Sequence, residues 1–233
     1  IREKVLGTNH LEVAESLNNL AALYDDKGDF AKSEPLYQRA LAIREKALGP
    51  DHSDVALYLN NLAVLYHYKG DYAKTEAFYQ RSLAIREKVL RPNHPDVAVS
   101  LNNLAALYSE KGDYAKAEPL FQRSLAIREK ALPPDHPDIA ASLNGLALLY
   151  NEAKADYAKA EPLFQRALAI REKPLGHDHR DVGPDLNNLA GIYYARGDYA
   201  KAEPLYQRAL VIYEKALGPN HMLVATALNN LAM

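Results

Sequence analysis

The feature that most constrains this chain is a sequence unit that recurs about every 42 residues. One copy, Leu101–Tyr108, reads Leu-Asn-Asn-Leu-Ala-Ala-Leu-Tyr, and close copies begin at Leu17, Leu59, Leu143, Leu186 and Leu228. Self-similarity at such a period is typical of stacked arrays, in which each unit buries its apolar side only against its neighbours. The length of 233 residues therefore indicates a number of stacked repeats rather than a number of globular domains.

Each unit carries the start and stop signals of two helices. In the third unit, Asn93 or His94 can cap a helix over 95–110, because a side-chain acceptor satisfies a backbone N–H that has no partner in the first turn. Gly112 supplies the left-handed residue that follows the end of this helix. A second helix over 114–132 then follows directly. The unit is therefore predicted to be two antiparallel helices joined by a tight turn.

The repeats predict an all-α fold, a right-handed α-solenoid of antiparallel helix pairs that forms one array over residues 1–233. The complete helix pairs are expected at about 11–48, 53–90, 95–132, 137–174 and 180–217. Partial repeats are expected at 1–6 and 221–233. Two irregularities stand out in this array. Ala155 replaces the turn glycine in a loop with one extra residue, and Gly183-Pro184 should delay or kink the start of the fifth first helix.

The repeated residues resemble a known family. Leu104-Ala105-x-x-Tyr108 followed by Ala117-x-x-x-Phe121 is similar to the tetratricopeptide pattern of L-G-x-x-Y and A-x-x-x-F. The period of 42 rather than 34 and the Leu-Asn-Asn-Leu-Ala run resemble the kinesin light chain subclass. The resemblance implies a helical array whose first helices line a concave surface that binds extended peptides.

The paired asparagines are the main candidates for ligand contacts. They lie on the side of each first helix opposite the apolar stripe, and an amide can match both groups of a peptide backbone. By resemblance, backbone binding is assigned to the second asparagine of each pair: Asn19, Asn61, Asn103, Asn188 and Asn230. Gly145 interrupts the series in the fourth unit. The alternative is that these amides bond neighbouring helices of the stack to each other.

An apolar patch is expected between the second and third units, where Asn61 and Asn103 would flank it. Its members occupy outward positions of the first helices: Leu57, Val64, Tyr68 and Val99. Backbone hydrogen bonding and an apolar side-chain pocket would then coincide, which favours an extended peptide with an apolar anchor. The alternative is that Leu57 and Val64 only pack on the preceding helix.

Composition argues against several other classes of function. The 28 basic and 30 acidic residues nearly balance, which disfavours nucleic-acid binding through bulk charge. There is no cysteine, which fits the cytoplasm, and no uninterrupted apolar run of the length that a membrane span needs. The histidines recur once per repeat and are expected to cap helices rather than bind metal. No catalytic motif and no cofactor site is recognised, so we expect no enzyme activity.

Two functions remain open at this level. The first is a non-catalytic scaffold that binds a protein or peptide in its concave groove. The second is a spacer or sensor array of a larger signalling protein whose enzymatic domain lies outside this segment. Apolar residues near both ends, including Val5 and Leu228, also predict end-to-end self-association. Charge runs such as Arg128-Glu129-Lys130 are interpreted as solvated helix surface.

Overall fold

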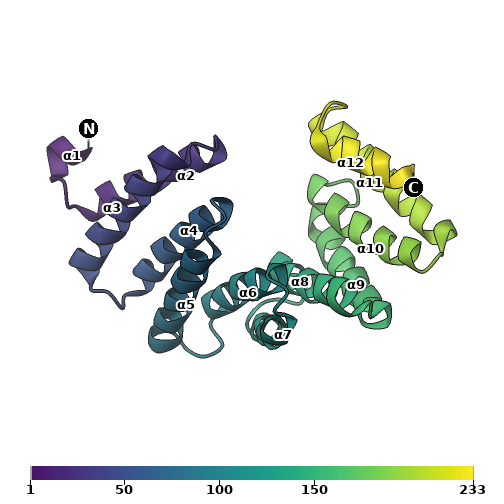
Figure 1. Ribbon diagram of the computed structural model, residues 1–233, viewed down its shortest axis with the longest axis horizontal. Coiled ribbons are helices and arrows are strands. Elements are labelled where there is room, and N and C mark those ends of the chain that lie inside the picture. The colour runs from purple at the N-terminus through teal and green to yellow at the C-terminus, as the bar shows by residue number, and fades with distance from the viewer. Residues whose placement is uncertain (1, 233) are drawn as a thin grey trace. The chain divides into compact units, whose positions relative to one another are not determined.

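The computed structural model describes residues 2–232, apart from the side chain of Lys154, and these residues form helices and short connections without strands. The helices are α1 (Arg2–Leu6), α2 (Leu11–Asp26), α3 (Phe30–Leu48), α4 (Ser53–Tyr68), α5 (Tyr72–Val89), α6 (Pro95–Glu110), α7 (Tyr114–Ala131), α8 (Pro137–Lys154), α9 (Tyr157–Leu175), η1 (Arg180–Val182), α10 (Gly183–Ala195), α11 (Tyr199–Leu217) and α12 (Met222–Leu231). They follow one another as helix pairs joined by tight turns (Figure 1).

The chain divides into two compact units at Leu107 and Tyr108, within α6. In the first unit α2 packs on α3 and α4 on α5, and in the second α8 packs on α9 and α10 on α11. We call the first helix of each repeat the A helix and the second the B helix. Each B helix also contacts the A helix of the next repeat, as α3 contacts α4 and α9 contacts α10. A single array over residues 1–233 stays a prediction.

The repeating histidines start the A helices. His52 has extended backbone before α4, and its Nδ1 accepts a hydrogen bond from the N–H of Asp54 at 3.1 Å. The same bond recurs at His10, His94, His136, His179 and His221. The predicted capping role is therefore confirmed. Each histidine satisfies one of the N–H groups that the first turn of a helix leaves without a partner.

The core is made of leucines and tyrosines at helical spacing. On α4, Leu59, Leu62 and Leu65 are fully or almost fully buried, and Tyr37 of the B helix α3 belongs to the same core cluster. This follows from the predicted stripe, because residues three and four apart share one face of a helix. Burying these side chains supplies most of the stability of each unit.

Charge runs at the ends of B helices, such as Arg128-Glu129-Lys130, were predicted to be solvated, and for Arg86 and Arg128 this is wrong. Arg128 is only 4% exposed, and its Nη1 donates to Ser142 Oγ at 2.7 Å and to the carbonyl of Asp138 at 2.8 Å. Arg86 makes the same two contacts with α6, through Ser100 Oγ and the carbonyl of Asp96. The burial lowers the pKa of the Arg128 guanidinium. Arg128 is buried because it lies next to Ile127 on the side of α7 that meets the following A helix.

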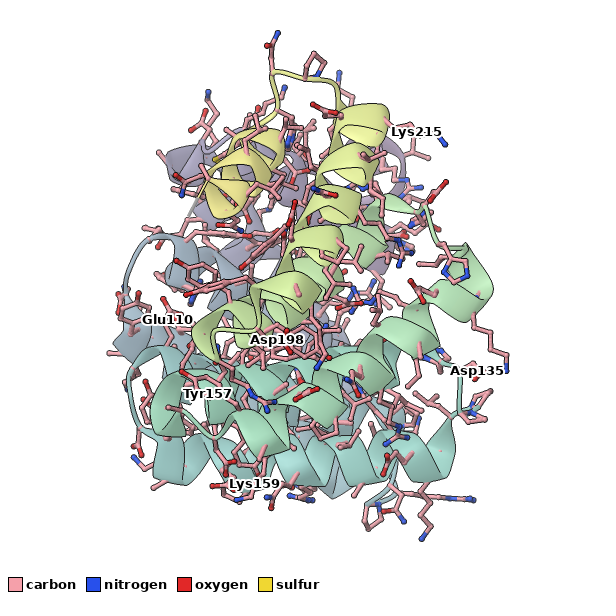
Figure 2. All side chains as sticks on the ribbon, turned by 90° about the vertical axis from the view of Figure 1, so that its right-hand side faces the viewer. Glu110, Asp135, Tyr157, Lys159, Asp198 and Lys215 are labelled. Atoms are coloured by element: carbon pink, nitrogen blue, oxygen red, sulfur yellow. The ribbon has the colours of Figure 1, made fainter. Side chains whose placement is uncertain are left out.

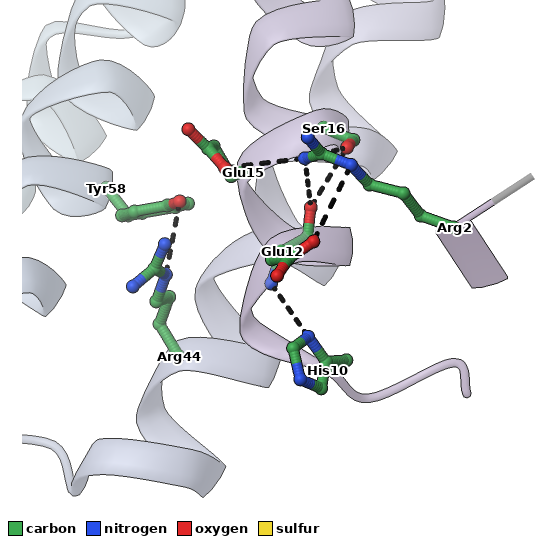
Figure 3. A network of polar contacts seen from close by, with 7 residues as sticks. All are labelled: Arg2, His10, Glu12, Glu15, Ser16, Arg44 and Tyr58. Carbon is green, nitrogen blue, oxygen red and sulfur yellow. Dashed lines mark hydrogen bonds and ion pairs between the residues drawn. The ribbon is translucent and has the colours of Figure 1, made fainter. Parts of the chain in front are cut away.

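The first unit begins with a variant of the same contact. Arg2 of α1 donates to Ser16 Oγ at 3.0 Å and to the carbonyl of Glu12 at 3.1 Å (Figure 3). Arg44 instead donates its Nε to the Tyr58 hydroxyl at 3.2 Å, because tyrosine occupies the place of the serine in α4. An arginine therefore links one B helix to the next A helix at each of these junctions.

Both predicted irregularities have structural counterparts. Ala155 takes the left-handed conformation, with φ 46° and ψ 30°, where the third unit has Gly112 at φ 75°. The fifth A helix begins late, since Arg180–Val182 form a 3-10 turn before α10 starts at Gly183. Gly183 also permits close packing, because a Cβ there would lie 2.5 Å from the ring of Tyr213.

Candidate peptide-binding face

Three A helices of the first unit present matching stripes of exposed or half-buried side chains. On α4 the stripe is built at intervals of four, three and four residues, so that its members share one side of the helix. We define the A-helix face as the following set: Glu15, Asn19, Ala22 and Asp26 on α2; Leu57, Asn61, Val64 and Tyr68 on α4; Val99, Asn103 and Ala106 on α6. This face brings together three of the five asparagines assigned to peptide binding and all four residues of the predicted apolar patch.

Hydrogen bonds between asparagines connect the helices along this face. Asn61 donates its side-chain amide to Asn18 Oδ1 at 2.8 Å, and Asn103 donates to Asn60 Oδ1 at 2.8 Å. The second asparagine of one repeat thus bonds the first asparagine of the preceding repeat. The interhelical contact considered as an alternative is present, and Asn61 and Asn103 nevertheless remain partly exposed. An asparagine amide carries a second N–H and an oxygen, which these two bonds do not use.

The apolar side chains of the A-helix face are accessible to different degrees. Leu57 is 49% exposed and Tyr68 is 63% exposed, whereas Val64 and Val99 are half-buried. The ring of Tyr68 is stacked on that of Phe30, with centroids 6.1 Å apart and planes 9° apart. About half of the Leu57 side chain is therefore accessible, and stacking on the neighbouring repeat holds Tyr68 in one orientation.

The α2 part of the A-helix face is acidic, because Glu15 and Asp26 are exposed there. In the second unit, Asp198 precedes α11 and Lys215 lies in its last turn; both are labelled in Figure 2. Asp198 pairs with Lys201 at 2.8 Å, and this bond holds the pKa of Asp198 below its usual value. Such charges complement the dipole of the helix.

The asparagines of the second unit have different surroundings. Asn144 donates to Asp185, and Asn187 donates to the hydroxyl of Tyr213 at 3.4 Å. Asn188 is half-buried, and Asn230 lines a pocket at the end of α12. At Gly145, where the series is interrupted, a Cβ would lie 2.4 Å from Cε1 of Phe121. The glycine is therefore needed for the close approach of this ring.

Sequence reasoning missed a polar cluster that joins successive repeats. The hydroxyl of Tyr66 donates to Glu34 Oε1 at 2.7 Å and accepts from Gln38 Nε2 at 3.3 Å. The cluster recurs as Tyr150 with Glu118 and Gln122, and as Tyr193 with Glu161 and Gln165. The signal that predicts it is a glutamate followed four residues later by glutamine in every B helix.

Within residues 2–232, no three histidine or acidic side chains come together in a group that could hold a metal ion. Among the helices of this described part, none combines the length and the apolar character that crossing a membrane requires. The A-helix face thus presents amides, apolar side chains and carboxylates, which are groups suited to binding a ligand.

The stacked helix pairs and the asparagines along the A-helix face are features of helical-repeat proteins, a class whose members generally bind other proteins. The sequence profile of the tetratricopeptide repeat matches residues 1–46, 12–88, 54–130, 96–173 and 186–233. The chain belongs to the tetratricopeptide repeat family. The predicted fold class is thereby confirmed.

Solved structures place the chain close to the kinesin light chain-like type. BtubC (BKLC) from P. vanneervenii is 29% identical with a TM-score of 0.76, covering 93% of this chain and 84% of its own. The putative kinesin light chain repeats of Podosopora anserina are 28% identical with a TM-score of 0.71, covering 89% of this chain and 98% of their own. The predicted resemblance is confirmed. No curated protein sequence matches the chain.

The same fold occurs in a more distant protein. A signal transduction ATPase with numerous domains and a tetratricopeptide repeat sensor, from Pyrococcus horikoshii, is 19% identical with a TM-score of 0.69. The match covers 95% of this chain and 33% of that protein. At this identity the likeness shows the fold alone.

Proposed function

We propose that the chain is a non-catalytic scaffold that holds an extended segment of another protein along the A-helix face of the first unit. The tetratricopeptide repeat fold is generally a protein–protein interaction scaffold. The observation that carries the finer proposal is the stripe on α4, where the amide of Asn61 lies between the exposed side chains of Leu57 and Tyr68. Asn19 and Asn103 repeat the amide on the neighbouring helices, and Asn188 and Asn230 are its counterparts in the second unit.

The chemistry of the face favours a particular kind of segment. A peptide in extended conformation offers one backbone donor and one acceptor per residue, and a partly exposed asparagine can meet both. Leu57 and Val64 would contact an apolar side chain of the ligand, in the manner of peptides that read a groove through alternate residues. Glu15 and Asp26 favour basic residues beside this apolar anchor.

Binding to a peptide array, compared between the parent and two variants, tests the proposal. Val64→Asp places a charge in the apolar stripe, and Asn103→Ala removes one amide. Each is expected to weaken binding by roughly tenfold or more, the effect of losing about 1.4 kcal/mol. Val211→Asp is the matched control, because Val211 is an exposed valine of the B helix α11, outside the A-helix face.

Circular dichroism of all three variants separates binding from folding. Loss of peptide binding in Val64→Asp and Asn103→Ala, with helicity retained and with Val211→Asp unaffected, supports the site. Equal binding in all variants, or loss only where the helical signal is also lost, contradicts it.

A sensor array within a larger signalling protein is the second candidate. The fold is compatible with this role, because the Pyrococcus horikoshii protein that shares it is described as having a tetratricopeptide repeat sensor. The sequence of the gene on either side of this segment tests it, since a neighbouring nucleotide-hydrolysing or protease domain would assign the array to that role. End-to-end association through Val5 and Leu228, which are exposed, is a further proposal.

A further inference from the structure

An exposed aromatic stack lies at one end of the A-helix face. The ring of Tyr68, the last residue of α4, is stacked on that of Phe30, the first residue of α3. Their planes differ by only 9°. His67 meets the Tyr68 ring edge-on, with centroids 6.1 Å apart and planes at 72°. Because Phe30 covers one face of the ring and Tyr68 is 63% exposed, the opposite face of the ring is open to solvent.

The repeat fold does not require an aromatic residue at the place of Tyr68. The corresponding positions of the other complete repeats carry Asp26, Glu110, Glu152 and Ala195. Tyr68 is therefore the only aromatic residue among the five. Exposed tyrosines of this kind are enriched where proteins contact their partners, because the ring supplies a large contact area at a low cost in conformational entropy. Tyr68 is thus a candidate for contact with a ligand.

A carboxylate of the preceding repeat lies at the same end of the face. The hydrogen bond from Asn61 to Asn18 Oδ1 fixes the register between α4 and α2. Asp26 occupies on α2 the place that Tyr68 occupies on α4, and it is exposed. It also ends α2, and three residues separate it from Phe30, on which Tyr68 stacks. Asp26 and Tyr68 are therefore neighbours on the A-helix face.

The surroundings of this carboxylate are negative. Burial raises the pKa of the Tyr37 hydroxyl, and the nearby carboxylates of Asp25 and Asp26 raise it further. Both charges therefore act on the same part of the first unit. Lys69, which follows Tyr68, pairs with Glu34 of α3. Lys27 is exposed at the end of α2, so that the two aspartates and this lysine together leave one net negative charge.

An open aromatic face beside a carboxylate suits one kind of cation in particular. A guanidinium is planar and can stack on a tyrosine ring, and its N–H groups form a fork that matches a carboxylate. A lysine ammonium is a point charge and has no plane to stack. Asp26 and the ring of Tyr68 therefore favour arginine over lysine.

We propose that Tyr68 and Asp26 form a subsite for an arginine side chain of the extended segment that the A-helix face binds. The guanidinium stacks on the open face of Tyr68 and donates hydrogen bonds to the Asp26 carboxylate. This inference rests on the proposed function, and it names the basic residue that accompanies the apolar anchor. Phe30 holds the tyrosine ring from the other side, so that the stacking surface exists before the ligand arrives.

Synthetic peptides with one leucine and one arginine test the subsite. Threonine spacers of different length separate the two residues, since threonine favours extended backbone. Matched peptides replace the arginine by citrulline, which keeps the shape and removes the charge, or by lysine. NMR titration measures the affinities, and the ring signals of Tyr68 and Phe30 report the place of binding. At the best separation, the arginine peptide is expected to bind about tenfold more tightly than the citrulline peptide and roughly threefold more tightly than the lysine peptide.

Two variants of the protein each remove one part of the subsite. Tyr68→Leu keeps an apolar side chain but removes the ring, and Asp26→Asn removes the charge. Each is expected to weaken binding of the arginine peptide by roughly fivefold to tenfold, whereas Tyr68→Phe retains the ring and the affinity. The matched controls, Tyr199→Leu and Asp178→Asn, change an exposed tyrosine and an exposed aspartate outside the A-helix face and are expected to have no effect.

Preference of the parent for arginine over citrulline, lost in Asp26→Asn while the helical signal is retained, supports the subsite. Equal affinity for the arginine and citrulline peptides, tighter binding of the lysine peptide, or unchanged binding by Tyr68→Leu and Asp26→Asn overturns it. Absence of binding at every separation also overturns the subsite, and the peptide array then decides the scaffold proposal by itself.

Replacing the leucine of the peptide by serine keeps the two proposals apart. If serine weakens binding and citrulline does not, the arginine subsite is overturned while the scaffold proposal stands. If citrulline weakens binding and serine does not, the subsite is supported and the apolar anchor is contradicted.

Discussion

Asn103 donates its side-chain amide to Asn60 Oδ1 at 2.8 Å, in the same register in which Asn61 donates to Asn18. The amides proposed to bind a peptide therefore also join the A helices of successive repeats. Holding the amide in place lowers the entropy that a ligand must offset to order it. It also means that alanine substitution on this face has two effects, one on stability and one on binding, which separate measurements must resolve.

A double-mutant cycle on Asn18 and Asn61 measures the structural effect. Asn18→Ala and Asn61→Ala are each expected to lower the free energy of unfolding by about 1 kcal/mol, the net value of a hydrogen bond between neutral groups. The double variant is expected to lose less than the sum, by roughly 0.5–1 kcal/mol, because the two changes remove one bond. Guanidinium chloride unfolding followed by circular dichroism provides the values. Strict additivity would contradict the contact.

Gly145 gives a sharper prediction, because alanine normally stabilises a helix relative to glycine. Gly145→Ala is expected to destabilise the protein by about 1–3 kcal/mol, since its Cβ would lie 2.4 Å from Phe121 Cε1 and forces the ring to move. Gly191→Ala in α10 is the control, because the nearest atom there is 3.7 Å away. It is expected to raise stability by up to about 1 kcal/mol. Thermal unfolding of both variants tests the difference in sign.

Local signals explain why the helix bounds could be predicted. The first helix of the third unit was expected over 95–110, and α6 runs from Pro95 to Glu110. Its start is determined by the adjacent His94, whose Nδ1 accepts from the N–H of Asp96 at 3.1 Å. Its end is followed by Gly112 in the left-handed conformation. Each of these causes acts within three residues of the helix end, so the sequence contains them.

Contacts between repeats could not be predicted in the same way. The ring of Phe121 explains Gly145, but the two residues are on different helices and no local rule connects them. Arg128 was interpreted as solvated because Glu129 and Lys130 follow it. The preceding Ile127 is buried, and Arg128 lies beside it on the buried side of α7. The exposure of Leu57 and Tyr68 followed from helical spacing alone. The partner of each asparagine depends on the register between helices, which the sequence of one helix does not contain.

Ala155 adopts a backbone conformation that favours glycine, with φ 46°. Ala155→Gly is therefore expected to raise the free energy of unfolding by roughly 0.5–1 kcal/mol, because relief of the left-handed strain exceeds the additional entropy that glycine loses on folding. Urea unfolding of the variant checks the sign. Ala153→Gly, within the helical part of α8, is the control and is expected to lower stability by about 1 kcal/mol. Loss of stability in both variants would argue against a strained turn.

Asp185 is a buried carboxylate at the place where the third and fourth repeats have Ser100 and Ser142. It pairs with Arg171 Nε at 3.0 Å and accepts a hydrogen bond from Asn144. Burial raises the pKa of Asp185, and the pairing with Arg171 and the bond from Asn144 offset this only in part. The folded protein therefore binds a proton at pH values where the unfolded chain has already released it.

The sign of the resulting pH dependence is fixed by linkage. Between the ordinary value of 3.8 and the raised folded pKa, the folded state binds more protons, so stability falls as pH rises, by at most about 1.4 kcal/mol per pH unit for one group. Asp185→Ser is expected to remove this fall and to leave Arg171 bonded to a hydroxyl, as Arg128 is to Ser142. Asp198→Ser is the control with the opposite sign, since the folded pKa of Asp198 is lowered and its contribution is lost only as pH falls. Chemical unfolding from pH 3 upward would contradict the assignment if the parent and Asp185→Ser curves stayed parallel.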